Sequence, residues 1–121
     1  MKAQAISAIN SIKANDVKNL AAMNSPPKTA TVLLNAVCAL FGMEESWEES
    51  KKLMANKAFF DHMINYDVDS MPMKLVRHVQ TNYTEHKENS QYFIPANAKK
   101  ISAALQGLAQ WVTGVILYRS I

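Results

Sequence analysis

The 121-residue sequence has few of the residues that form phosphate loops, cross-links and metal sites. Three glycines cannot build a glycine-rich phosphate cradle, and neither the P-loop nor the dinucleotide-binding glycine pattern occurs. The single cysteine, Cys38, excludes an internal disulfide and suits a reducing compartment. The three histidines, His62, His78 and His86, fall on different expected elements with no i, i+4 pair, which argues against a zinc site. We therefore expect no catalytic residues, no metal and no cofactor, and interpret the chain as a non-enzyme.

The chain also lacks a strong excess of charge of one sign. Its thirteen basic and ten acidic residues give a net charge of +3. They are sorted along the sequence, because residues 43–70 carry seven acids and three bases, a net charge of −4, and leave +7 for the rest. A fold that separates charge in this way has a basic face that attracts a polyanion in a salt-dependent manner. Solvated helix faces without any partner explain the same charges equally well.

Continuous apolar runs are scarce. Residues 1–23 are amphipathic and contain no signal-peptide core, so we do not expect export. Residues 101–118 carry no charge and approach the length of a membrane-spanning helix. Two glutamines and two glycines make this segment poorly suited to lipid. We favour a helix buried in protein and keep a tail anchor as an alternative.

What remains is a helical pattern. Apolar residues recur at intervals of three and four between the prolines at 26–27, 72 and 95, which predicts an all-α chain. Gly42 is placed to end one helix, Ser46 and Glu49 form a capping box for the next, and Asn56 can cap the one after it. The expected helices cover residues 2–23, 28–41, 47–55, a segment after Asn56, 73–83 and 95–121, with a loop over 84–92.

The first expected helix has an inconsistent apolar seam. Lys13 and Asp16 occupy seam positions of its main heptad frame, and other apolar residues lie outside that frame. A helix with two competing registers pairs weakly in either, so we expect that it can slide. The residues in the main frame are Ile6, Ile9, Leu20 and Met23, and those outside it are Ile12 and Val17.

The first and last segments are both long and amphipathic, so the simplest arrangement pairs them antiparallel beside a small bundle. In one continuous last helix, Lys99 and Lys100 would lie in the second turn, near the positive end of the dipole. Two lysines in that position do not stabilise the fold. An acidic partner would explain them, with chance placement on a solvated face as the alternative.

Beyond these patterns, one set of residues follows a known order along nearly the whole chain. Its members are Pro26, Pro27, Cys38, Gly42, Trp47, Phe59, Asp67, Pro72, Phe93, Pro95, Ala103, Ala104, Leu108, Trp111 and Val112. The most specific part is a double proline followed at the right distance by F-x-P and by A-A-x-x-x-L-x-x-W-V. With these residues the sequence resembles the microtubule-binding domain at the stalk tip of dynein heavy chains.

The resemblance implies about six helices on the end of a short antiparallel coiled coil. Residues 1–24 would be the outgoing stalk helix, 25–106 the microtubule-binding bundle, and 107–121 the start of the returning stalk helix, continuous with the last bundle helix. In the family, the ATP state of a distant motor ring slides one stalk helix against the other and so controls affinity for the microtubule. One-turn shifts of about 5.4 Å are a known kind of helix ratchet.

The resemblance also implies the partners and the contact residues. The partners would be tubulin in the microtubule and the remainder of the heavy chain, with no nucleic acid and no membrane. The Asp67–Pro72 turn favours a cilium or flagellum axoneme over the general cytoplasm. The chain departs from the family at Thr31, where a lysine is common, at Asn35, where a glutamate is frequent, and at Ile94, which replaces a capping threonine. The microtubule-facing positions here are Lys28, Thr31, Asn56, Lys57, Lys99 and Lys100.

An alternative function is a helical adaptor that binds a protein helix through methionine and aromatic surfaces. Such an adaptor would show little salt dependence, whereas a basic face on an acidic filament would lose affinity as salt rises.

Overall fold

The computed structural model describes residues 2–10 and 12–120, with side chains from residue 6 onward. Helices and short turns account for the secondary structure of this part of the chain, which contains no strand, so the all-α prediction is confirmed. The α-helices are α1 (Lys2–Asn10), α2 (Ala14–Ala21), α3 (Lys28–Leu40), α4 (Trp47–Ala55), α5 (Phe59–Ile64), α6 (Met73–Val79), α7 (Pro95–Lys99) and α8 (Ala103–Ser120).

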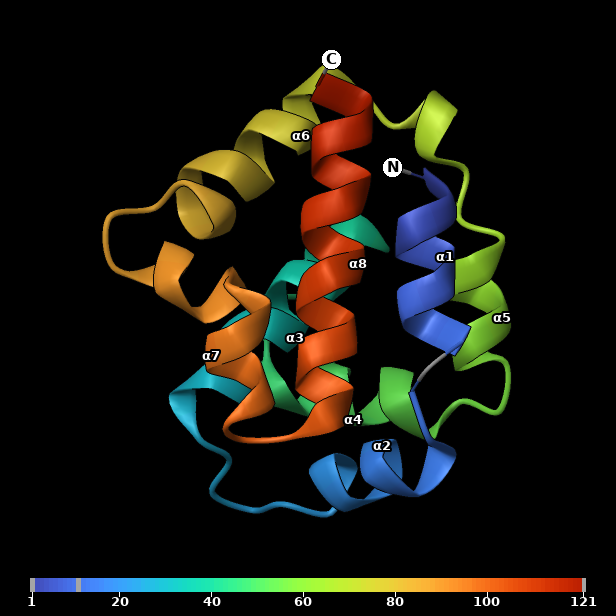
Figure 1. Cartoon of the computed structure of the whole chain (residues 1–121), viewed down its shortest axis with the longest axis vertical. Helices are drawn as coiled ribbons and strands as arrows, with labels where there is room; N and C mark the ends of the chain where they lie inside the picture. The colour runs from blue at the N-terminus through green and yellow to red at the C-terminus, as the bar shows by residue number, and fades with distance from the viewer. Residues whose placement is uncertain (1, 11, 121) are drawn as a thin grey trace.

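The first and last helices lie side by side and run antiparallel, as expected (Figure 1). Both ends of the chain lie at the upper end of the molecule in that view, and α2, α4 and α7 lie towards the opposite end (Figure 1). α3, α6 and α7 pack against α8, whereas α4 packs against α3 and α5 packs against α1. Near its end, α8 is tied to the turn that precedes α6, because Tyr118 donates to Asp69 at 2.9 Å and Arg119 Nε donates to the Met71 carbonyl at 2.9 Å.

The core is centred on α3 and α8. Nine of the thirteen residues of α3 are buried, so this helix is apolar on most of its circumference. The Trp111 ring of α8 stacks on Phe41 at 5.9 Å between centroids and meets the edge of Tyr66 at 5.6 Å. Aromatic contacts of this geometry add to the free energy of burial. Cys38 Sγ lies 3.3 Å from Ser50 Oγ, which joins α3 to α4 inside the core.

The predicted helix ends are largely confirmed. The backbone of Gly42 adopts a positive φ of 71°, the left-handed conformation that glycine accepts without strain. Ser46 accepts a hydrogen bond from the Glu49 N–H at 3.3 Å and caps α4. The Asn56 side chain accepts from the Ala58 N–H at 2.8 Å in the turn that leads into α5.

The prediction of one continuous helix over residues 2–23 is wrong. α1 ends at Asn10 and α2 begins at Ala14, with Lys13 in an extended conformation between them. The break explains the two competing heptad frames. Residues of both frames are buried because α1, α2 and the link between them each turn apolar side chains inward, whereas Lys13 is exposed. The buried residues are Ile9, Ile12, Val17 and Leu20.

The last helix is also interrupted. α7 ends at Lys99 and α8 begins at Ala103, so a single helix from residue 95 to the end is wrong. Ser102 Oγ accepts from the Ala104 N–H at 3.1 Å, which is the hydrogen bond of an N-capping serine. The chain therefore restarts its helix at a local capping signal.

The segment after α6 differs from the predicted helix and loop. α6 passes into a π-helical turn over Gln80–Thr84, and Asn89–Phe93 forms a 3₁₀ helix inside the predicted loop. Helices this short give no apolar period in the sequence. The π-helical turn carries the buried ring of Tyr83, which donates a hydrogen bond to Glu45.

Candidate functional site

The six predicted contact residues fall into three pairs, and the first pair lies at the start of α3. Lys28 is exposed, and its Nζ lies 6.0 Å from the centroid of the Tyr92 ring, within range of a cation–π interaction. Thr31 is half-buried, and its hydroxyl donates to the Lys28 carbonyl at 2.9 Å. Further along α3, Asn35 Oδ1 is buried with no hydrogen-bond partner among the described residues. Lys28 is therefore the basic group among these three residues of α3.

The second pair, Asn56 and Lys57, forms the connection from α4 to α5. Both residues are exposed. The Asn56 side chain holds the turn through the Ala58 N–H, as described above, and this fixes the backbone that carries Lys57. The lysine therefore projects from a structured turn and not from a loose loop.

The third pair, Lys99 and Lys100, does not lie near the start of a helix as the sequence suggested. Lys99 is the last residue of α7 and Lys100 follows it, so both lie at the carboxyl end of a helix. The dipole favours basic side chains there by a few tenths of a kcal/mol. The two exposed lysines thus suit the fold, and the argument that they require an acidic partner is wrong. They remain available to one because both are exposed.

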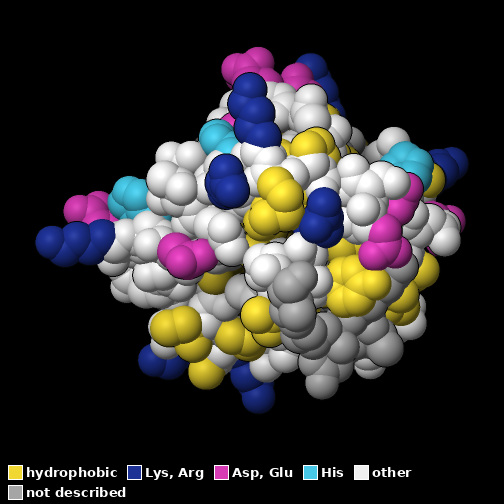
Figure 2. Space-filling view, turned by 90° about the horizontal axis from the view of Figure 1, so that it is seen from above, with side chains coloured by type: hydrophobic (Ala, Val, Ile, Leu, Met, Phe, Trp, Pro, Cys, Tyr) yellow, Lys and Arg dark blue, Asp and Glu magenta, His cyan; other side chains and the backbone are white. Residues whose placement is uncertain are grey.

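The three pairs share one end of the molecule. The start of α3 and the end of α7 lie on the left in Figure 1, and the α4–α5 connection lies on the right. All three lie away from the end that holds the chain termini (Figure 1). Figure 2 views the molecule from above, from the end that holds the termini, and there acidic and basic side chains are interspersed with apolar ones between them.

The structure contains a polar cluster that sequence reasoning missed. His78 Nε2 lies 3.0 Å from the Glu45 carboxylate, which also accepts the hydroxyl of Tyr83. Asn82 contacts the other ring nitrogen of His78 at 3.1 Å. Burial first, and then the Glu45 hydrogen bond and charge, raise the pKa of Tyr83. The cluster joins the α3–α4 connection to α6, and no sequence pattern indicates a pairing across more than thirty residues.

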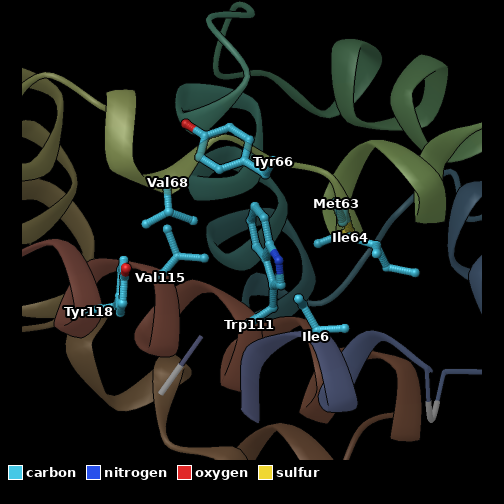
Figure 3. Close-up of a pocket in the computed structure, with 8 residues that line it drawn as sticks. All are labelled: Ile6, Met63, Ile64, Tyr66, Val68, Trp111, Val115 and Tyr118. Carbon is cyan, nitrogen blue, oxygen red and sulfur yellow. The ribbon is translucent and has the colours of Figure 1, made fainter. Parts of the chain in front are cut away.

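The apolar recess beside Trp111 has no room for a ligand. Trp111 points between Tyr66 and Ile6 in Figure 3, and the cavity volume is about 10 Å³, at most the space of one water. No cluster of metal-ligating side chains occurs in the described part of the chain. Over the same residues, none of the helices combines the length and apolarity that a bilayer crossing requires.

Comparison with known proteins identifies relatives along almost the entire chain, although no family model matches it. A cytoplasmic dynein heavy chain of Paramecium tetraurelia is 31% identical over 93% of this chain, and cytoplasmic dynein 2 heavy chain 1 of Caenorhabditis elegans is 31% identical over 94%. Dynein axonemal heavy chain 3 of Homo sapiens is 25% identical over 94%. The chain is a homologue of dynein heavy chains.

The homologous region is a small part of those proteins, because the chain covers 2% to 3% of their length. Among solved structures, the microtubule binding domain of DYNEIN-C matches with a TM-score of 0.81 and 24% identity, over 97% of this chain and 81% of that one. This likeness confirms the fold implied by the sequence resemblance. The relatives include both axonemal and cytoplasmic dyneins.

Proposed function

We propose that this chain is the microtubule-binding unit at the stalk tip of a dynein heavy chain. The observation that carries the proposal is the antiparallel pair α1 and α8, along which the other helices pack as a bundle (Figure 1). The homology to dynein heavy chains over 94% of the chain supports it. In this function the unit performs no catalysis, needs no cofactor and contacts neither nucleic acid nor membrane.

The proposed contact with tubulin uses the end of the molecule opposite to the termini. Its residues lie at the start of α3, in the α4–α5 turn and at the end of α7. The lysines of this face attract the acidic filament, and Thr31 and Asn56 add neutral contacts. The proposed contact residues are Lys28, Thr31, Asn56, Lys57, Lys99 and Lys100.

We propose that sliding of α1 against α8 changes the affinity of this face in response to ATP in the distant motor ring. Residues 1–24 and 107–121 would then be stalk and residues 25–106 the binding bundle. Residues 1, 11 and 121 of these ranges lie outside the described residues. A one-turn shift of α1 of about 5.4 Å would replace the side chains that α1 packs against α8 with those about four residues away. The two registers would differ in the packing of α1 against α8, and the pair could change from one register to the other.

The heavy chain that contains this unit would act on the cytoskeleton, and we favour an axoneme. The Asp67–Pro72 turn supports that preference, together with the likeness to axonemal heavy chains from Homo sapiens and Mus musculus. Localisation of a tagged full-length heavy chain in ciliated cells would test it, because a purely cytoplasmic signal would contradict the axonemal assignment.

Co-sedimentation with polymerised tubulin tests the binding function. We expect the chain to pellet with microtubules at low salt and to lose affinity steeply as salt rises. The double reversal Lys99→Glu with Lys100→Glu should reduce binding by at least about tenfold. The matched control is Lys74→Glu with Lys87→Glu, which makes the same change in net charge at exposed lysines outside the proposed face.

Two results would reject the proposal. Binding that does not respond to salt would favour the helical adaptor. Equal loss of binding in both double variants would mean that net charge matters and the proposed face does not. Circular dichroism of each variant must show the helical spectrum of the parent chain.

A further inference from the structure

A groove lies on one side of α2, beside the proposed microtubule face. It lies between α2 and the α4–α5 connection and has a volume of about 390 Å³. Clefts of this size accommodate a ligand or a few side chains of a peptide. The recess beside Trp111 is far smaller, so the groove is the better candidate for a binding site.

The floor of the groove is apolar. Val17 and Ala21 of α2 face Met54 of α4 across it, and two aromatic residues of α5, Phe59 and Phe60, close it. Phe59 is buried, and Phe60 is half-buried and therefore offers part of its ring to the groove. Such a floor suits one large apolar side chain.

The rim of the groove is basic. Among the described residues that line it, the charged ones are Lys18 and Lys57, and both are exposed. The acid of α2, Asp16, lines a separate recess on the other side of that helix, against Ile101. α2 therefore presents its basic side chain to the groove and its acidic one away from it.

We propose that this groove binds an acidic peptide segment of a partner protein, which inserts one large apolar side chain between α2 and α5. Carboxylates of the segment on either side of that anchor pair with Lys18 and Lys57. A second copy of the chain fits less well, because each copy carries a net charge of +3 and would place like charge against the lysine rim. The groove shares Asn56 and Lys57 with the proposed microtubule face, but binding of a free peptide does not depend on that function.

The test uses a fluorescein-labelled peptide of ten glutamates with one central phenylalanine, and fluorescence anisotropy as the readout. We expect saturable binding that weakens by at least about tenfold when the phenylalanine is replaced by serine or the glutamates by glutamine. Lys18→Glu with Lys57→Glu should weaken it similarly, whereas Lys74→Glu with Lys87→Glu should change it much less. Amide chemical-shift changes on titration should concentrate on α2, α4 and α5.

A second variant blocks the groove without removing charge. Ala14 is exposed at the first position of α2 and lines the groove, so Ala14→Leu adds bulk without cutting into the core. It should abolish peptide binding and leave the salt-dependent binding to microtubules in place, which separates this proposal from the proposed function. The proposal is overturned if Ala14→Leu binds the peptide normally, if the serine peptide binds as well as the phenylalanine peptide, or if shifts concentrate on α7. Self-association of the chain that Ala14→Leu abolishes would also overturn it, in favour of a second copy.

Discussion

Gly107 of α8 packs so closely against Ile12 that a Cβ atom added to the glycine would lie 2.5 Å from Cγ1 of the isoleucine. The same atom would lie 3.1 Å from the backbone oxygen of Ala8. The absence of a side chain at this position lets the end of the first segment approach α8. Gly107 therefore determines how α1 and α8 are aligned.

We expect Gly107→Ala to destabilise the fold by about 1–3 kcal/mol, the usual effect of overpacking. Alanine is a better helix former than glycine by about 1 kcal/mol, so the contact must outweigh that preference. In the Ile12→Ala background the clash with the side chain is removed, and Gly107→Ala should become neutral or stabilising. Urea unfolding of the four variants measures this coupling.

Gln110→Ala provides the control, because Gln110 is exposed on the same helix and should tolerate alanine. A stabilising effect of Gly107→Ala in the parent chain would refute the close packing. If α1 slides as proposed, Gly107→Ala should also change microtubule affinity while the salt dependence stays the same, because the basic face is untouched.

Replacing Ile94 with serine should stabilise the chain. Ile94 occupies the N-cap position of α7 in an extended conformation, makes no side-chain cap and is 50% exposed. Serine would accept a hydrogen bond from a free N–H of the first turn, a gain of about 1 kcal/mol. The midpoint of urea unfolding should rise. Ile94→Ala is the matched control, since it removes the same exposed side chain without supplying a cap, and equal midpoints for the two variants would contradict the prediction.

Two tyrosines should make the fold sensitive to high pH. Burial raises the pKa of Tyr66 and of Tyr83 above the ordinary value of 10.0. Below that value both states keep the phenolic proton, and the free energy of unfolding does not depend on these groups. As pH rises above it, the unfolded chain ionises first, and the fold loses up to about 1.4 kcal/mol per pH unit for each tyrosine.

Unfolding in urea at several pH values between 8 and about 11.5 measures this loss. Tyr83→Phe should flatten part of the slope, at a loss of about 1 kcal/mol at neutral pH for the hydrogen bond to Glu45. Adding Tyr66→Phe should flatten more of it. An unchanged slope in the double variant would show that other groups cause the alkaline sensitivity.

Local signals made much of the fold predictable. Each of these signals depends only on residues nearby in the sequence, and the structure has helix boundaries where they indicate them. They are the left-handed Gly42, the Ser46 cap and the prolines before α3 and α6. The antiparallel pairing of the end segments also followed from amphipathicity. The capping serine before α8, Ser102, was an equally local signal, but the apolar pattern around it favoured a continuous helix.

Features that depend on tertiary contacts could not be predicted. The break at Lys13 allows apolar residues on either side of it to be buried against different helices, and heptad analysis describes only a continuous helix. The position of Lys99 and Lys100 was misjudged for the same reason, because their relation to a helix dipole depends on where α7 ends. The His78–Glu45–Tyr83 cluster joins distant parts of the sequence and has no local signature.

The interruption between α1 and α2 has a mechanical consequence. α8 runs unbroken for eighteen residues, about 27 Å, and is fastened near its end to Asp69 and Met71. A tensile load along α8 therefore reaches the bundle through a stiff rod. The same load along α1 must pass the bend at Lys13 before it reaches α2. α1 and α8 therefore transmit force to the bundle unequally. Under load, we expect the link at Lys13 to deform before α8 does.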